Sequence, residues 1–340
     1  MPRNDTPAKA VIFGCAGTTL TEDERRFFEI TDPLGFILFA RNVADPAQVR
    51  ALVADLRATV GRADAPVLID QEGGRVQRLS PPHWRKAPPA AVFAAAAAGN
   101  RDRGVAAARL NARLLAEELR TLGIDVDCAP VLDVPVAGAH DIIGDRAFGR
   151  EPDLVALLGR AACDGFLDGG VLPVIKHIPG HGRALADSHL DLPVVDADAA
   201  LLERMDFAPF RALAGAPWAM TAHVVYTAFD AERPATLSPT IIEGVIRGRI
   251  GFDGLLLTDD LSMKALSGDF GERTALAFAA GCDVALHCNG DPAEMAAIAA
   301  AAPPLSDAAL DRLRRAEAQR RRPEPLDTAE ALRTLEEWLA

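Results

Sequence analysis

The chain has 340 residues, of which 49% are hydrophobic and 25% are charged. This composition is typical of a globular protein and excludes an intrinsically disordered chain. The 48 acidic residues outnumber the 36 basic residues, which gives a formal net charge of -12. Because phosphates and anionic lipid head groups are also negative, we expect neither a nucleic acid nor a membrane as a partner.

The sequence contains no segment with the length of a transmembrane helix. The longest run of small apolar residues, 90–99, is much shorter than the roughly 20 residues that a membrane span requires. The first residues are polar, and no long apolar region with a small-residue cleavage site follows them. We therefore expect a cytoplasmic protein, and we expect it to be a monomer.

The cysteines do not form the pattern of a disulfide framework. Their number is odd, their spacing is wide, and apolar residues surround most of them. We predict reduced, buried thiols without a metal or catalytic role at Cys15, Cys128, Cys163, Cys282 and Cys288.

Short apolar runs alternate with longer helical patterns along the chain, which is typical of repeated strand–helix units and a parallel sheet. The predicted strands are residues 10–15, 35–39, 67–69, 125–131, 173–176, 218–222, 254–258 and 283–287. The predicted helices are residues 21–30, 46–60, 101–122, 153–168, 198–213, 239–249, 272–280 and 292–301. Because eight parallel strands close a barrel, we predict an α/β fold with a single (β/α)8 barrel of the TIM type over residues 1–304.

Residues 305–340 carry two further helical patterns on either side of the Arg321-Arg322-Pro323 segment. We expect them to form a helical extension that packs on the barrel, with its basic residues in solvent. An open, doubly wound sheet shares the alternating pattern. However, residues 13–17, which follow the first strand, lack the Gly-x-Gly-x-x-Gly sequence of a phosphate loop.

The polar residues that follow the predicted strands define the expected site. In a parallel barrel these positions converge at one rim, although they are distant in the sequence. They are Asp70, Asp133, Lys176, His177, His223, Asp259 and Asp260.

A glycine-rich loop follows the fifth predicted strand. It reads Lys-His-Ile-Pro-Gly-His-Gly over residues 176–182, so His177 and His181 cannot lie on one helical face as zinc ligands do. Such a loop can move over a bound substrate, and Asp187 can fix the tautomer of His189 by a hydrogen bond. We interpret Asp187 and His189 as a proton shuttle. The alternative is a pair of ordinary solvated loop residues.

Two adjacent carboxylates, Asp259 and Asp260, follow the seventh predicted strand, and strand alternation sends them to opposite sides. One faces the barrel mouth as an ionised nucleophile, beside Lys176 or an arginine, and the other binds backbone amides. Their position alone leaves open which residue takes which role.

The segment after the third strand, residues 69–78, carries Asp70 and two arginines on a glycine-containing loop. An aspartate that accepts from hydroxyls and an arginine that donates to them form a common way to hold a sugar. For Glu72 and Arg75 we favour an internal ion pair. For Arg146, on the long loop after the fourth strand, structural and ligand-binding roles both remain open.

Several of these segments together resemble glycoside hydrolase family 3, and within it the single-domain bacterial β-N-acetylglucosaminidases of cell-wall recycling. The matching segments are residues 70–76, 144–149, 176–182, 187–189 and 258–263. The resemblance implies a (β/α)8 barrel and a retaining mechanism through a covalent glycosyl-enzyme. It implies Asp259 as the nucleophile, and His189, assisted by Asp187, as the acid and base.

The same resemblance places further residues around the sugar. It puts Asp70, Arg78, Arg146, Lys176 and His177 on the hydroxyls and Met263 near the glycosyl pocket. It implies no cofactor and no metal, and a small-molecule carbohydrate as substrate, namely N-acetylglucosamine linked to an anhydromuramyl aglycone. Ile178 departs from the phenylalanine often found at this position in the family, which we expect to be a packing change.

Other functions remain as alternatives. A phosphorylase or a β-glucosidase shares the family scaffold, and a non-catalytic sugar-binding barrel shares the fold. A metal-dependent barrel hydrolase using His177, His181, His189 and His223 belongs to another class, although the first strand offers no His-x-His pair.

Overall fold

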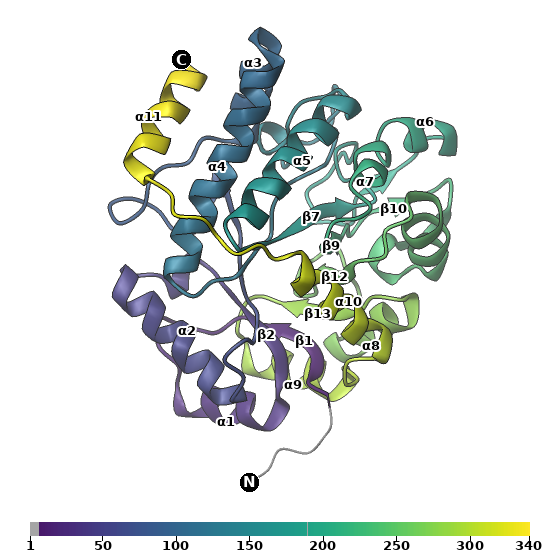
Figure 1. Ribbon diagram of the computed structural model, residues 1–340. Coiled ribbons are helices and arrows are strands. Elements are labelled where there is room, and N and C mark those ends of the chain that lie inside the picture. Colours follow the sequence, from purple (N-terminus) through teal and green to yellow (C-terminus); the bar gives the residue numbers. More distant parts are fainter. Residues whose placement is uncertain (1–6, 189) are drawn as a thin grey trace.

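The computed structural model describes residues 7–188 and 190–340, and its strands form a closed parallel barrel surrounded by helices (Figure 1). Around the barrel the order is β1 (Lys9–Phe13), β13 (Val284–His287), β12 (Leu255–Asp260), β9 (Trp218–Thr221), β7 (Leu172–Ile178), β6 (Val126–Asp127), β3 (Val67–Ile69) and β2 (Pro33–Leu38). Each strand overlaps one of the predicted runs. The predicted (β/α)8 barrel is therefore confirmed.

The strands are apolar on both faces because each face meets an apolar layer. Ile12 and Leu257 belong to a buried cluster inside the barrel, whereas their neighbours Phe13 and Leu256 belong to the cluster between strands and helices. This is the reason that the strands show no strict alternation of apolar and polar residues.

The outer layer consists of helices that follow the strands in turn. They are α1 (Glu22–Thr31), α2 (Pro46–Val60), α3 (Ala90–Gly99), α4 (Arg101–Thr121), α5 (Pro152–Asp168), α6 (Ala199–Arg204), α7 (Ala208–Ala212), a π-helix (Thr240–Ile250), α8 (Phe270–Ala280) and α9 (Pro292–Ala301). Side-chain caps fix several starts, with Asp45 accepting from the first amides of α2 and Asp291 from those of α9.

One predicted helix, 198–213, is interrupted, and the structure divides it into α6 and α7. Pro209 lies in the first turn of α7. Proline lacks an N–H and disfavours a helical residue before it, so it is compatible with a new helix start but not with a continuous helix. The alanine-rich segment 90–99 was not among the predicted helices and forms α3.

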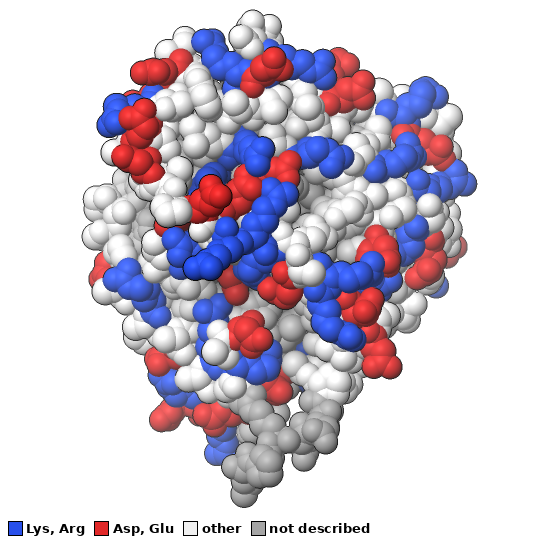
Figure 2. Space-filling view, in the orientation of Figure 1, with Lys and Arg blue, Asp and Glu red and all other residues white. Residues whose placement is uncertain are grey.

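Helix α10 (Asp307–Gln319) lies across the amino-terminal end of the barrel, where Leu305, Ala309 and Ala316 join the interior cluster. Arg312 pairs there with Asp283 at 2.8 Å. Acidic and basic side chains are intermixed on this face (Figure 2). Helix α11 (Thr328–Leu339) packs against α4. Since α10 covers one end of the barrel, the carboxyl ends of the strands form the open end.

Two small sheets, which the sequence did not predict, extend this open end. One is the hairpin of β4 (Gln71–Gly73) and β5 (Val76–Gln77). The other contains β8 (Val194–Val195), β10 (Val225–Tyr226) and β11 (Asp230–Pro234). The hairpin follows β3 directly and lies between Asp70 and Arg78, two of the residues predicted for the site.

The cysteines are buried free thiols, as predicted. Across residues 7–188 and 190–340, no helix combines the length and the apolar character needed to cross a membrane.

Candidate active site

A pocket of about 460 Å³ opens at the carboxyl ends of the strands. It brings together most of the residues predicted for the site, namely Asp70, Arg78, Arg146, Lys176, His177, Asp259 and Met263. Its other lining residues are Ile37, Phe39, Glu72, Arg75, Val76, Ile142, Met220, Asp260, Leu286 and Cys288. Residues in or after the third, fifth and seventh predicted strands therefore converge as the barrel geometry requires.

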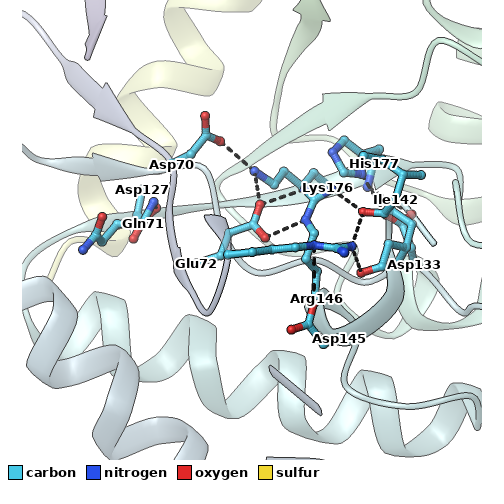
Figure 3. A network of polar contacts seen from close by, with 12 residues as sticks. Asp70, Gln71, Glu72, Asp127, Asp133, Ile142, Asp145, Arg146, Lys176 and His177 are labelled. Carbon is cyan, nitrogen blue, oxygen red and sulfur yellow. Dashed lines mark hydrogen bonds and ion pairs between the residues drawn. The ribbon is translucent and has the colours of Figure 1, made fainter. Parts of the chain in front are cut away.

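Lys176, at the end of β7, lies at the centre of a network of buried charges (Figure 3). Its Nζ donates to Asp70 Oδ1 at 2.7 Å and lies 2.7 Å from Glu72 Oε1. Burial alone would lower the pKa of Lys176, but Asp70 and Glu72 raise it above its ordinary value. The ammonium therefore stays charged in spite of being 2% exposed.

Glu72 holds two cations of this network in place. Its carboxylate receives a bidentate pair of bonds from Arg146, both at 2.8 Å, in addition to the contact with Lys176. The predicted ion pair between Glu72 and Arg75 is therefore wrong. The hairpin turns between the two residues, and Arg75 instead donates to the carbonyl oxygens of Ile142 and Ile143.

Asp70 and Glu72 are both ionised acceptors. Burial would raise the pKa of each carboxyl, but Lys176 acts on both, together with Arg78 on Asp70 and Arg146 on Glu72. These cations hold both pKa values below their ordinary range. The pocket thus presents fixed carboxylates beside fixed N–H donors, a set that can bind several hydroxyl groups at once.

His177 is oriented by the fully buried Asp133. Its Nδ1 lies 2.7 Å from Asp133 Oδ2, and the backbone amides of His177 and His181 donate to Asp133 Oδ1 at 3.2 and 2.6 Å. Burial would raise the pKa of Asp133, and His177 lowers it. The ring of His177 is consequently fixed with one edge on Asp133 while the residue lines the pocket.

The two adjacent aspartates have different surroundings. The carboxylate of Asp260 accepts from the backbone amides of Ser262 and Cys288, at 3.0 and 3.1 Å, and from the Ser262 hydroxyl at 2.6 Å. Asp259 lines the pocket, and its Oδ1 accepts from the Asp260 amide at 2.8 Å. Both aspartates line the pocket and both accept from a backbone amide, but only the Asp260 carboxylate accepts from two such amides and a hydroxyl among the bonds described. Lys176 lines the same pocket as Asp259 and forms ion pairs with Asp70 and Glu72.

The loop predicted to carry the proton shuttle lies beside the segment that follows Asp259. Asp187 is half-buried, and the carbonyl of the next residue, Ser188, accepts from the Ala265 amide at 3.3 Å. His189 lies outside the described residues, so its predicted pairing with Asp187 stays a prediction. His181, in the same loop, has its pKa lowered to about 4 by burial.

His223, named in the metal-dependent alternative, has both ring nitrogens in contact with the protein. Its Nδ1 lies 2.7 Å from Thr236 Oγ1, and its Nε2 lies 3.0 Å from the Asp260 carbonyl. Among the residues that the structure describes, no group of three or more histidine, cysteine, aspartate or glutamate side chains is arranged to hold a metal ion.

Sequence reasoning missed the role of Glu72. A usable signal was present, because Asp70 and Glu72 are two residues apart in an extended segment and so face the same side. Arg75 lies in the turn after β4, where this alternation ends, so closeness in the sequence does not bring it to Glu72. Asp133 was placed at the rim, but nothing in the sequence shows which histidine it contacts.

Comparisons with known proteins agree with this geometry. The family model for the glycosyl hydrolase family 3 N terminal domain matches residues 22–317. A beta-hexosaminidase from Thiobacillus denitrificans is 43% identical over 282 residues, which cover 81% of this chain and 76% of that protein.

Two solved structures are also similar to the chain. NagZ from Neisseria gonorrhoeae in complex with N-trifluoroacetyl-D-glucosamine shares 32% identity with a TM-score of 0.88, over 98% of this chain and 99% of that one. A glycoside hydrolase family 3 beta-N-acetylglucosaminidase from Paenibacillus sp. shares 34% identity with a TM-score of 0.83, over 97% of this chain and 66% of that longer chain. The chain therefore belongs to glycosyl hydrolase family 3, as its motifs indicated, and is a glycoside hydrolase.

Proposed function

We propose that the protein is a retaining β-N-acetylglucosaminidase that removes terminal, β-linked N-acetylglucosamine. The names of its relatives support the sugar, and the pocket supports the chemistry. The observation that carries the proposal is Asp259 on the wall of a pocket whose other polar groups are already fixed for binding hydroxyls. A natural substrate with an anhydromuramyl aglycone, from peptidoglycan recycling, fits this activity.

In the proposed binding mode, ionised Asp70 accepts hydrogen bonds from sugar hydroxyls, while Arg78, Lys176, Arg146 and His177 donate to others. Because these groups are held by their own partners before a ligand arrives, little ordering is required of the protein upon binding. Met263, buried on the same wall, offers an apolar contact to the sugar ring.

In the proposed first step, an oxygen of Asp259 bonds to C1 of the sugar as the bond from C1 to the leaving oxygen breaks. His189, oriented by Asp187, gives its proton to that oxygen. In the second step the same imidazole takes a proton from water, the water oxygen bonds to C1, and the Asp259 carboxylate is released. An imidazole that has lost its proton is neutral, so it does not repel an anionic aglycone as a carboxylate would.

The test is hydrolysis of aryl β-glycosides that differ only at C2, with a fluorinated analogue to trap the intermediate. We expect the N-acetylglucosaminide to be hydrolysed in preference to the glucoside and the xyloside, with label recovered on Asp259. A preference for the glucoside would contradict the sugar assignment, and label elsewhere would contradict the nucleophile.

A phosphorylase would show the same sugar preference. Rates in phosphate and in a phosphate-free buffer separate the two, because phosphorolysis yields a glycosyl phosphate whereas hydrolysis yields the free sugar. We expect the free sugar in both buffers.

A further inference from the structure

Asp127, on β6, is a fully buried carboxyl that the proposed mechanism does not use. It lies beside Gln71, next to the charged network (Figure 3). Its Oδ1 accepts a hydrogen bond from the Gln71 backbone amide at 3.0 Å. Its Oδ2 is buried and has no hydrogen-bond partner among the described residues. A carboxylate with an oxygen in this state is very costly, and a neutral carboxylic acid costs less.

The surroundings of Asp127 also disfavour a negative charge. Its neighbours along the strand, Val126 and Cys128, belong to the apolar cluster inside the barrel, so Asp127 points to the opposite face of the strand. The ionisable groups that act on it from neighbouring segments are Lys176 on β7, and Asp70 and Glu72 after β3. The single cation among them is already bound by both of the other carboxylates.

These influences oppose one another, and burial prevails. Burial raises the pKa of Asp127 to about 8, the carboxylates of Asp70 and Glu72 act in the same direction, and the Gln71 amide and Lys176 oppose it. The remaining ionisable neighbour, the thiol of Cys128, is uncharged because burial raises its pKa as well.

Through Gln71, Asp127 supports the hairpin that separates Asp70 from Arg78, two of the residues proposed to bind the sugar. The Gln71 side chain accepts from the amides of Arg78 and Leu79, at 2.9 and 3.0 Å, and donates to the Leu79 carbonyl at 3.0 Å. Gln71 thus joins the two strands of the hairpin, and Asp127 holds the Gln71 backbone. Glu72, which contacts Lys176, lies on this hairpin, and Arg78, which contacts Asp70, directly follows it.

We propose that Asp127 is a positioning residue that carries a proton at neutral pH, and that loss of this proton in alkaline solution disturbs the hairpin and weakens sugar binding. Ionisation would place a third negative charge beside Asp70 and Glu72, without a cation of its own. The repulsion acts on the two carboxylates that fix Lys176, and the effect therefore reaches the pocket.

The proton on Asp127 also makes the stability of the folded protein depend on pH. The difference in the pKa of Asp127 between the folded and unfolded states fixes the direction of that dependence. The unfolded chain releases the Asp127 proton near pH 3.8, whereas the folded protein retains it up to about pH 8. Between these values the folded state binds more protons, so the contribution of Asp127 to stability is lost as the pH rises. Above about pH 8 both states are ionised, and the loss stops.

The first experiment compares urea unfolding of the full chain and of Asp127→Asn between pH 5 and 9. Asparagine keeps the acceptor oxygen for Gln71 but cannot ionise. The ratio of the wild-type unfolding constant to that of the variant should rise about tenfold per pH unit up to about pH 8, and then level off. If the two proteins showed the same pH dependence, Asp127 would be ionised when folded, and the proposal would be wrong.

A matched control is Asp283→Asn, which alters another buried carboxyl at the opposite end of the barrel. Asp283 is paired with Arg247 at 2.9 Å and Arg312 at 2.8 Å. Its variant should be destabilised by loss of this charge but should keep the wild-type pH dependence between pH 5 and 8. If the stability of Asp283→Asn also varied less with pH than that of wild type, the pH dependence could not be assigned to Asp127.

The second experiment tests the link to the pocket and rests on the proposed function, because its probe is N-acetylglucosamine. We expect the inhibition constant of wild type to rise several-fold above pH 8, while that of Asp127→Asn changes little with pH. Asp127→Leu, which lacks the acceptor, should bind weakly at every pH. Equal alkaline losses in wild type and Asp127→Asn, or unchanged binding by Asp127→Leu, would overturn the positioning role.

The two experiments fail separately. If N-acetylglucosamine binds to neither protein at any pH, the proposed function is wrong, but the unfolding experiment still decides whether Asp127 holds a proton.

Discussion

Two regions at the open end of the barrel are built in different ways. The network around Lys176 is buried, and each of its carboxylates faces two cations: Lys176 and Arg78 for Asp70, and Lys176 and Arg146 for Glu72. The loop after β7 instead exposes apolar side chains next to Asp187, with Leu185 71% and Leu190 67% exposed. Other residues of the same loop are buried and paired, with His181 Nε2 3.1 Å from Ser188 Oγ and Arg183 2.9 Å from Asp206.

Because the two regions are built differently, they suit different parts of the reaction, namely sugar binding and proton transfer to the leaving group. Binding of hydroxyl groups gains from donors and acceptors that are fixed in advance, because no reorganisation is then needed as the substrate enters. Proton transfer to a leaving group requires access for a variable aglycone. The exposed part of a loop moves at a lower free-energy cost than its buried part. We therefore expect changes in the network to act on sugar binding and changes in the loop to act on the leaving group.

The largest effect should come from Asp259, which belongs to neither region. Asp259→Asn should lower kcat by about 10⁴-fold or more, because removal of a nucleophile removes the covalent route. In Asp259→Ala, which leaves room for a small anion, added azide should restore part of the turnover of an aryl glycoside and yield a glycosyl azide of inverted configuration. Asp260→Asn is the control, since its carboxylate binds backbone amides. Azide rescue of Asp260→Ala and not of Asp259→Ala would exchange the two roles.

The second-largest loss of activity is expected for His189→Ala, and its size should depend on the leaving group of the substrate. For an alkyl or disaccharide glycoside the loss should be about 10²- to 10⁴-fold, the usual contribution of a general acid. For an aryl glycoside with an activated leaving group, the loss in the first step should be much smaller, because that group departs without a proton. Equal losses on both substrates would mean that this loop does not act on the leaving group.

The contrast between the two regions also shows what can be predicted from the sequence. The barrel and its rim follow from the order of apolar runs, because the topology of parallel strands fixes where their ends meet. This placed Asp70, Lys176 and His177 correctly at the pocket. The pairing within the network did not follow, since it depends on which side chains face each other after the hairpin of residues 71–77 has formed.

Ion pairs between residues that are distant in the sequence are the second feature that could not be predicted from the sequence. Arg146 meets Glu72 across a separation of 74 residues, and no local pattern in either segment encodes this contact. The favoured Glu72–Arg75 pair rested on closeness in the sequence, which is a poor guide in an extended hairpin. The division of 198–213 into two helices was more accessible, because Pro209 marks the break.

Glu72→Gln tests the contribution of the buried network around Lys176 to sugar binding. It leaves Lys176 and Arg146 buried with a neutral partner, so we expect KM to rise about tenfold or more and stability to fall by about 3 kcal/mol. Glu118→Gln is a control, because Glu118 pairs with Arg85 at 3.2 Å and does not line the pocket. It should lose stability without a change in KM. A rise in KM in both variants would mean that destabilisation alone causes the effect.

The same network predicts a dependence on acidic pH. Because Lys176 and Arg146 lower the pKa of Glu72 against the effect of burial, its ionised form stabilises the folded protein above the ordinary value of 4.5. That contribution is lost as the pH falls from about 4.5 to about 2. Unfolding free energies measured over this range should fall by up to about 1.4 kcal/mol less per pH unit in Glu72→Gln than in wild type. An identical fall in both proteins would show that Glu72 is not stabilised as an anion.

The smallest effect is expected at the edge of the pocket, for Arg75→Ala. Arg75 is 42% exposed, and its carboxylate partners Asp141 and Asp145 lie at 3.5 and 3.4 Å, so these ion pairs contribute little. Its bonds to the carbonyls of Ile142 and Ile143 shape the wall that Ile142 forms. We expect KM to rise by about two- to fivefold with kcat retained, since an exposed pair is worth about 1 kcal/mol at most.

Arg25→Ala, which removes an exposed pair on the helical layer, should leave KM unchanged. If Arg75→Ala raised KM as much as Glu72→Gln does, the pocket wall formed by Ile142 would hold the sugar together with the buried charges.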